Sequence, residues 1–241
     1  MKDIDSIAVL QDPVRRRLYE YVAAQGREVG RNEAAEAAGV ARTLAAHHLD
    51  KLTEAGLLEC GSRRLTGRSG PGAGRPAKVY TRARVERSVS LPARDYRTAA
   101  ELLAEAAEQA GLDAGLCAVA RRRGEALRGS AAPCGGLEEA MKMLAARGYE
   151  PYLEGDESAE GAEGVQAAEG IEGTTGAAAR VVRMRNCPFH AVAEGFPPLV
   201  CGMNLALLEG LFGTDGAVRA RMDARPGECC VVLENSKSND D

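Results

Sequence analysis

The segment at residues 39–59, GVARTLAAHHLDKLTEAGLLE, most constrains the fold, because it indicates a helix with a glycine at each end. Gly39 and Gly56 can adopt the positive φ with which a chain turns sharply next to a helix. Between them we expect a helix at residues 41–55, with a polar first turn and an apolar face. The residues expected to face inward are Leu44, Leu49 and Leu52. A helix with these features is typical of the recognition helix of a DNA-binding domain.

Two shorter helices are predicted before this segment. Asp12 and Pro13 are typical of a helix start, because Asp accepts hydrogen bonds from unpaired backbone N–H groups and Pro loses no bond in the first turn. A second helix is expected at residues 32–38, where Gly39 ends it. The apolar face of the first helix is expected to consist of Val14, Leu18, Tyr21 and Val22.

Two short strands are predicted after the segment, at residues 57–65 and 77–81, and a loop rich in Gly, Arg and Pro joins them. Three helices followed by a strand, a basic loop and a second strand predict a winged helix-turn-helix domain over residues 1–85. The basic loop would be the wing.

The first residues of a recognition helix lie against base edges in the major groove, and Lys reaches phosphates. His48 lies four residues after Leu44, so roles in the core and in binding remain equally open for it. The other predicted DNA contacts are Arg42, Thr43 and His47 to base edges, Ala46 to a thymine methyl group, and Lys51 to phosphate.

The predicted wing is rich in cations. A glycine-rich loop is suited to approach a phosphate backbone or a minor groove, although an ordinary solvated basic loop is the alternative. Residues 1–95 hold 17 basic and 12 acidic side chains and the rest of the chain holds 14 and 23, which indicates that only the first part meets a polyanion, unless the asymmetry is chance. The expected contacts are Arg63, Arg64, Arg68, Arg75 and Lys78.

Residues 7–84 resemble the winged-helix regulators of bacteria whose first domain ends in a wing containing Gly-Arg-Pro, here residues 74–76. The resemblance implies a homodimer bound to a near-palindromic operator in double-stranded DNA. It also implies that helices after the wing hold the dimer together, and residues 96–110 are the candidate within a helical linker and dimerisation segment at residues 86–130.

The rest of the chain predicts a smaller α+β domain over residues 131–241, so the fold class is α+β. The segment at residues 154–177 has seven acidic residues and no basic one, and we expect it to be disordered. The expected helices of this part lie at residues 96–110, 113–127, 137–147 and 199–212, and the strands at 149–153, 178–185, 218–224 and 229–234.

Four of the seven cysteines lie in the last 55 residues, and His190 lies three residues after the first of them. Thiolate and imidazole are ligands that iron–sulfur clusters and soft metals prefer, so this part predicts a metal or cluster site. The cysteines could instead be buried and inert, or act as a metal-free thiol switch. The candidate ligands are Cys187, Cys201, Cys229, Cys230 and His190, whereas the isolated Cys60, Cys117 and Cys134 are interpreted as structural or incidental.

The stretch CPFHAVAEGFPPLVCGMNLALLEGLFG and the later RPGECCVVL resemble the C-terminal domain of the SufR-like repressors, which sense iron–sulfur clusters. In that family three cysteines hold the cluster, and Cys187 and Cys201 match the first two. The third match falls on Cys229 or Cys230, and His190 or the second thiol of that pair could be a fourth ligand. Neighbouring residues of a strand face opposite sides, so one cysteine of the pair would ligate and the other would pack in the core.

We therefore expect a DNA-binding transcriptional repressor whose C-terminal domain senses an iron–sulfur cluster, or a metal or redox state. The alternative is a winged-helix regulator whose second domain is zinc-stabilised or metal-free and senses a small molecule. An enzyme with Cys187 and His190 as nucleophile and base lacks an evident orienting carboxylate, so no enzymatic activity is expected. The start of the chain does not resemble a signal peptide and no apolar stretch reaches membrane length, so we expect a cytoplasmic location without a membrane partner.

Overall fold

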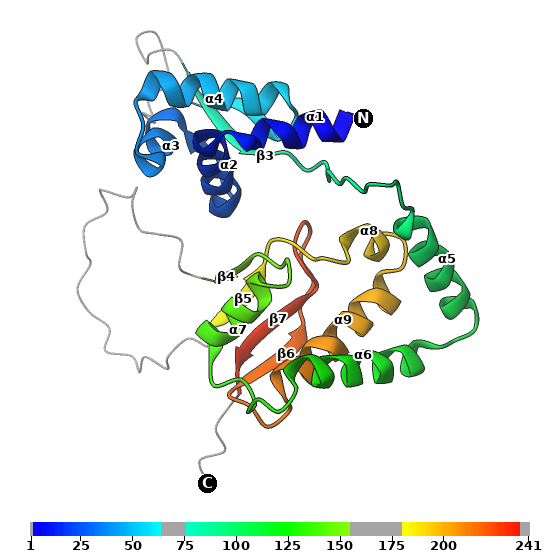
Figure 1. Ribbon diagram of the computed structural model, residues 1–241. Helices are drawn as coiled ribbons and strands as arrows, with labels where there is room; N and C mark the ends of the chain where they lie inside the picture. Colours follow the sequence, from blue (N-terminus) through cyan, green and yellow to red (C-terminus); the bar gives the residue numbers. More distant parts are fainter. Residues whose placement is uncertain (1, 64–75, 155–179, 237–241) are drawn as a thin grey trace, which may run out of the picture. The chain divides into compact units, whose positions relative to one another are not determined.

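The computed structural model describes residues 2–63, 76–154 and 180–236 (Figure 1). The chain divides into two compact units, Met1–Arg94 and Asp95–Asp241. The predicted segment at residues 86–130 includes residues of both units. Most of the predicted acidic segment at residues 154–177 lies outside the described residues, and so do Arg64, Arg68 and Arg75.

The helices of the first unit form around a small apolar core. The side chain of Asp12 accepts hydrogen bonds from Val14 N (2.8 Å) and Arg15 N (3.0 Å), which confirms the helix start predicted there. Gly39 has a φ of 65° and ends the helix that the sequence predicted at residues 32–38. The helices are α1 (Lys2–Ala8), the 3-10 turn η1 (Val9–Gln11), α2 (Pro13–Gln25), α3 (Arg31–Ala38) and α4 (Arg42–Glu54), and the sequence did not predict the first two.

The prediction that Leu44 of α4 lies in the core is wrong. Leu44 is 42% exposed, whereas Ala45, Leu49 and Leu52 are completely buried. The spacing explains the difference, because Ala45, Leu49 and Leu52 follow each other at intervals of four and three residues and share one face. Leu44 lies one residue, about 100°, away from that face.

A three-stranded antiparallel sheet completes the first unit, with strand order β1-β3-β2. Tyr80 of the central strand lies opposite Val29 on one side and Cys60 on the other, and its ring is completely buried in the core. The strands are β1 (Val29–Gly30), β2 (Leu58–Arg63) and β3 (Ala77–Arg82), of which β1 was not predicted.

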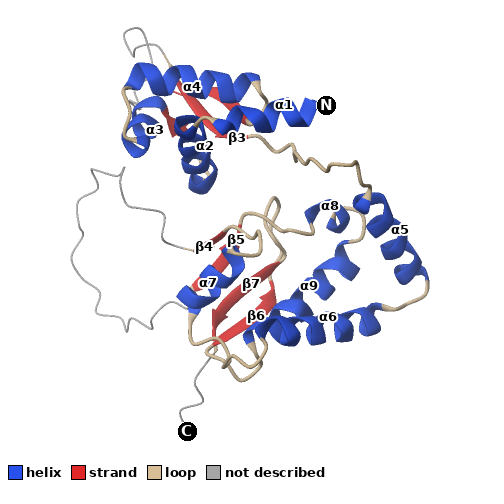
Figure 2. Cartoon of the chain, viewed as in Figure 1, coloured by secondary structure: helices blue, strands red, loops and turns tan. Residues whose placement is uncertain are grey.

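The second unit combines helices with a four-stranded antiparallel sheet of order β4-β5-β7-β6 (Figure 2). The sequence predicted all of these elements except α8, within a few residues at each end. The helices are α5 (Tyr96–Gln109), α6 (Asp113–Arg128), α7 (Leu137–Ala145), α8 (His190–Ala193) and α9 (Pro197–Phe212), and the strands are β4 (Pro151–Leu153), β5 (Val181–Met184), β6 (Val218–Met222) and β7 (Val231–Asn235).

Helices α6 and α9 pack with their backbones in close approach at two glycines. A Cβ atom on Gly124 would lie 2.1 Å from Leu207 O, and one on Gly210 would lie 2.1 Å from Arg121 O. Helix α9 is apolar around most of its circumference, which is typical of a helix buried on several sides. It contacts α6, α8, β6 and β7 and forms the centre of the unit.

The pair Cys229–Cys230 lies just before β7 rather than inside the strand that the sequence predicted at residues 229–234. The alternation of strand residues therefore does not explain their environments, although Cys229 is buried and Cys230 only partly so. None of the helices in the described part of the chain has the length and apolar character needed to cross a bilayer.

Candidate functional site

The start of α4 presents an open polar face. Arg42, Thr43 and His47 are exposed and Ala46 is half-buried, and these four residues lie on adjacent turns of the helix. Arg and Thr side chains on such a face can donate hydrogen bonds to base edges, and Ala can contact a thymine methyl group. The arrangement is that of a surface able to enter a major groove.

His48 has a different environment from His47. It is half-buried, and its Nδ1 is buried without a hydrogen-bond partner among the described residues. Burial lowers the pKa of His48, and the nearby charges of Asp12 and Arg15 act on it in opposite directions. The surroundings of His48, near the start of α2, thus disfavour the charged form of the imidazole, which favours a packing role over DNA contact.

Asp50 joins α4 to two other elements, and the sequence analysis did not identify it. Its carboxylate accepts hydrogen bonds from Arg31 of α3 (3.1 and 3.2 Å) and from Lys78 Nζ (3.1 Å) and the Tyr80 hydroxyl (2.9 Å) of β3. Burial alone would raise the pKa of Asp50, but these hydrogen bonds and the charges of Arg31 and Lys78 lower it. The carboxylate thus holds α4 in position relative to α3 and β3.

Three predicted phosphate contacts are ion-paired within the first unit. Lys78 pairs with Asp50, Arg63 with Glu28 (3.4 Å), and Lys51 with Glu54 (2.7 Å). Exposed pairs of this kind stabilise a fold by only about 0–1 kcal/mol. Exchanging such a carboxylate for a phosphate therefore costs little, and the cations remain suited to a DNA backbone.

In the second unit, four cysteines from three separate segments come together. Cys187 follows β5, Cys201 lies near the start of α9, and Cys229 and Cys230 precede β7. Electrostatic interactions connect Cys187 with Cys201, Cys229 and Cys230, and Cys201 with Cys229 and Cys230. The four cysteines singled out in the sequence therefore form one cluster, which we call the thiol cluster.

The thiols of this cluster affect one another's protonation. The neighbouring thiol of Cys229 lowers the pKa of Cys187, whereas the thiol of Cys187, together with burial, raises the pKa of Cys229. Burial also raises the pKa of Cys201 to about 12. Within the described ranges, no three His, Cys, Asp or Glu side chains are arranged to hold a metal ion as they stand. All four cysteines of the cluster are free thiols.

His190, the fifth predicted ligand, lies at the surface at the start of α8. Its side chain is 64% exposed, and its Nε2 lies 3.3 Å from Glu194 Oε1, one turn further along the chain. The structure therefore pairs this imidazole with a carboxylate rather than with a thiol. Among the cysteines interpreted as structural, Cys134 is buried, Cys117 is half-buried and Cys60 is exposed.

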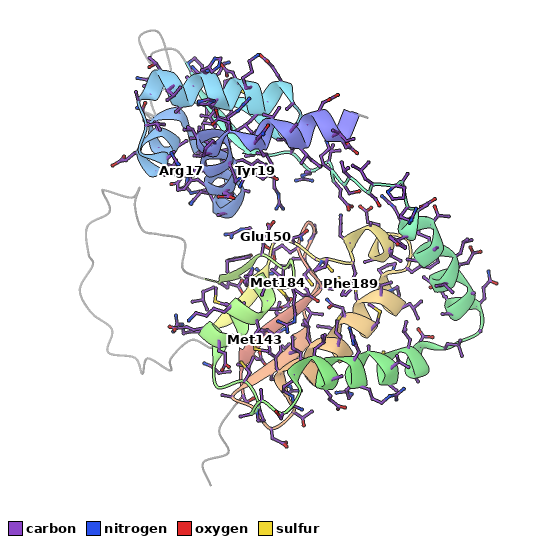
Figure 3. The ribbon with its side chains drawn as sticks, in the orientation of Figure 1. Arg17, Tyr19, Met143, Glu150, Met184 and Phe189 are labelled. Carbon is purple, nitrogen blue, oxygen red and sulfur yellow. The ribbon has the colours of Figure 1, made fainter. Side chains whose placement is uncertain are left out.

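The loop before the Cys229–Cys230 pair is fixed by a buried arginine. Arg183 of β5 is 1% exposed, and it forms ion pairs with Glu154 (3.1 Å) and Asp223 (2.8 Å). The Cys229 N–H donates to the carbonyl of Met184, which is labelled in Figure 3 (2.9 Å). Both contacts tie the backbone of the loop to β5 and so bring Cys229 close to Cys187.

A polar chain reaches the thiol cluster from inside the core. Asn204 of α9 is 2% exposed, and its Nδ2 donates to Cys229 Sγ at 3.4 Å. The hydroxyl of Tyr149, also buried, donates to Asn204 Oδ1 at 2.5 Å. Neither residue was singled out from the sequence, where an Asn inside an apolar helix was the only available signal.

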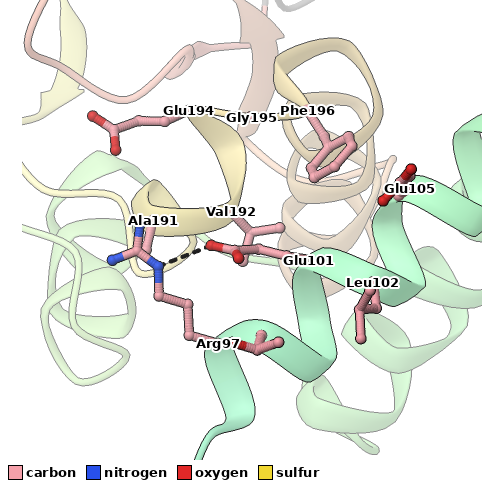
Figure 4. A pocket seen from close by; sticks show the side chains of 10 residues that line it. Arg97, Glu101, Leu102, Glu105, Ala191, Val192, Glu194, Gly195 and Phe196 are labelled. Carbon is pink, nitrogen blue, oxygen red and sulfur yellow. Dashed lines mark hydrogen bonds and ion pairs between the residues drawn. The ribbon is translucent and has the colours of Figure 1, made fainter.

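A groove of about 500 Å³ lies between α5 and α8 (Figure 4). Arg97 and Leu102 line it from α5, and Val192 and Phe196 line it from α8 and the residues that follow. Arg97 Nε donates to Glu101 Oε1 at 2.9 Å at its edge. An apolar wall with charged groups at the rim could take a small organic molecule.

Comparison with known proteins gives a match within the first unit. No curated protein and no solved structure matches the chain. A protein-family model described as a helix-turn-helix domain matches residues 10–61, which extend from η1 into β2 and include the whole of α2, α3 and α4. Residues 10–61 thus form a helix-turn-helix domain of the DNA-binding type, within a chain of mixed helix and sheet.

Proposed function

We propose that the protein is a transcriptional repressor that binds operator DNA through α4 and holds an iron–sulfur cluster on its thiol cluster. The helix-turn-helix domain supports DNA binding. The sensing role is supported by one observation: four cysteines from three distant segments of the chain lie near one another. Thiolates are the ligands of iron–sulfur clusters. The resemblance to SufR-like repressors favours repression.

Four thiols are donors of the kind that such a group takes, whereas no three of them are arranged to hold a metal ion as they stand in the described part of the chain. Cys187, Cys201 and Cys229 would be the ligands, with Cys230 as the fourth thiol, whereas the surface position of His190 argues against it. When bound, the cluster supplies a ligand whose presence depends on iron supply and oxidation state. Four thiols would also suit zinc, which is the alternative occupant.

The chain offers a route from the thiol cluster to the predicted dimer helix. Cys187 is three residues before α8, and α8 packs against α5. Leu102 and Leu103 of α5 are 62% and 72% exposed, and Tyr96 is 74% exposed. We propose that two copies pair through this face, so that a shift of Cys187 changes the spacing of two recognition helices. A bound group alters DNA affinity in this way only if it favours one arrangement of the dimer.

Anaerobic purification with analysis of iron, sulfide and zinc tests the sensing role, together with a visible absorption spectrum. Iron and sulfide in the wild type, and their loss in Cys187→Ser, are the expected results. Cys60→Ser, which removes an exposed thiol of the first unit, is the matched control. Stoichiometric zinc, or no metal at all, would contradict the cluster.

A second candidate function is favoured by the groove between α5 and α8. Its volume of about 500 Å³ and its mixed lining suit a small organic effector, which would act on the same dimer helix. Replacing Val192 by Trp would fill the groove. Loss of regulation in Val192→Trp, with the thiol cluster dispensable in Cys187→Ser, would favour this function over the cluster.

A further inference from the structure

Leu44 is an apolar side chain on the exposed side of α4. It is the third residue of the helix and is 42% exposed, whereas the next residue, Ala45, is completely buried. At about 100° per residue, Leu44 lies about 20° from Lys51 and about 60° from His47 around the helix axis. The side chains of Lys51 and His47 are both exposed. Leu44 therefore belongs to the open side of α4 and not to its packed side.

The neighbours of Leu44 on this side are polar or charged. Arg42 and Thr43 precede it in the first turn and are exposed, and Lys51 is held only in an exposed pair with Glu54 (2.7 Å), which a phosphate can replace at little cost. The cores of protein–protein interfaces are depleted in charged residues, whereas exposed cations beside a reading residue suit a DNA backbone. Helix α4 is also the last helix of the segment that matches a helix-turn-helix domain, and the first residues of that helix contact base edges in the major groove. DNA is therefore the partner that fits this part of α4.

A leucine can read only one group in the major groove. Its side chain has no hydrogen-bond donor or acceptor, so the polar edges of the bases give it nothing to recognise. The C5-methyl group of thymine is the apolar group presented there, and an aliphatic side chain packed on it removes apolar surface from water. We propose that Leu44 is a specificity-determining residue that selects a thymine at the position it faces in the operator. This inference rests on the proposed binding of operator DNA through α4, and it adds a base contact where the sequence predicted a core residue.

The test uses DNA from which single methyl groups are removed. A duplex that the wild-type full chain enriches from a random-sequence library is resynthesised with uracil in place of one thymine at a time. Uracil lacks the C5-methyl group and keeps the polar edge of the base. Fluorescence anisotropy gives the affinity for each duplex. At the thymine under Leu44, the wild type should bind the uracil duplex about fourfold more weakly, which corresponds to about 0.8 kcal/mol for one buried methyl group.

Two variants of Leu44 connect this effect to its side chain. Leu44→Ala shortens the side chain, and Leu44→Gln keeps a long side chain but replaces the branched methyl groups by an amide. Both variants should bind the thymine and uracil duplexes equally. Both should fold, because Leu44 lies outside the core and Ala and Gln are good helix formers. Leu127→Ala is the matched control, since Leu127 is 41% exposed on α6 of the second unit, and it should keep the fourfold difference.

Three results would overturn the inference, and they differ in what they mean for DNA binding. A difference between thymine and uracil that persists in both Leu44 variants assigns the methyl contact to another residue, such as Ala46. A wild-type chain with the same affinity for every uracil duplex has no methyl contact, but its binding of the selected duplex leaves operator recognition intact. A wild-type chain that enriches no duplex contradicts the proposed binding of operator DNA together with the inference.

Discussion

The hydroxyl of Tyr80 donates a 2.9 Å hydrogen bond to Asp50, joining the central strand of the first unit to α4. Arg31 reaches both residues, since its Nε bonds to the Tyr80 hydroxyl (2.9 Å) and its terminal nitrogen to Asp50. Three elements, α3, α4 and β3, are thus held by one group of polar side chains.

Tyr80→Phe should destabilise the first unit by about 1.5–3 kcal/mol, the range for hydrogen bonds to charged groups, because it removes the bonds of the hydroxyl to Asp50 and Arg31. The ring stays in the core, so the loss reports the hydroxyl alone. Chemical denaturation measures it, and Tyr19→Phe, which removes a hydroxyl of α2 outside this group, is the control. Equal loss in both variants would contradict the role of the Tyr80–Asp50 bond.

Asp50→Asn should reduce stability at neutral pH but not in acid. The pKa of Asp50 is lowered in the folded chain, so its stabilisation is present above the unfolded value and is lost as the pH falls through the folded value. The difference in unfolding free energy between wild type and Asp50→Asn should therefore shrink below about pH 4. Denaturation at several pH values tests this, with Glu59→Gln on β2 as control. A difference independent of pH would mean that the charge of Asp50 is not what stabilises the unit.

Arg42→Ala should weaken operator binding by about 1–3 kcal/mol, the range for a side chain that reads a base, and change binding to random DNA much less. Arg42 is exposed in the first turn of α4. Fluorescence anisotropy with both DNAs at fixed salt makes the comparison. Arg17→Ala on α2 removes the same charge away from α4, and it should affect the two DNAs alike. An equal loss on both DNAs in Arg42→Ala would assign Arg42 to phosphate.

Gly124→Ala should destabilise the second unit by about 1–3 kcal/mol or more, because a well-packed contact must open. The added Cβ would lie 2.1 Å from Leu207 O and 2.7 Å from Leu211 N. Gly115→Ala is the matched control on the same helix, where nothing lies within 4 Å. There the higher helix propensity of Ala should stabilise the protein by up to about 1 kcal/mol. Thermal denaturation should thus give shifts of opposite sign, and shifts of the same sign would contradict the close approach of α6 and α9.

Leu103→Arg should convert the proposed dimer into a monomer, because it places a charge in the middle of the apolar face of α5. Light scattering coupled to size-exclusion chromatography measures the mass. Leu127→Arg, on an exposed apolar position of α6, is the control and should remain dimeric. A monomeric wild type at micromolar concentration would contradict pairing through α5.

The sequence was informative where a pattern depends on local geometry. Asp12 and Gly39 identified helix ends because capping involves neighbouring residues. The prediction for Leu44 was wrong because a leucine at the edge of an apolar face is compatible with more than one rotation of the helix about its axis. The packing of the folded unit places Ala45 in the core and leaves Leu44 exposed. The four cysteines could be singled out by their chemistry, but their pairing needed the three-dimensional fold.

Asp50 and Asn204 show what the sequence could not supply. The partners of Asp50 lie 19, 28 and 30 positions away, and the amide of Asn204 meets Tyr149 across 55 positions. Isolated polar residues in helices are common, and no local pattern separates the few that organise a site from those that face solvent. Their roles follow from the tertiary contacts alone.

Cys229 and Cys230 are neighbours in the chain, and their thiols act on different partners: Cys229 on Cys187, which follows β5, and Cys230 on Cys201 of α9. Consecutive Cα atoms are only about 3.8 Å apart, so one short piece of backbone lies between the two partners. A displacement of that piece would act on the segment after β5 and on the start of α9 together.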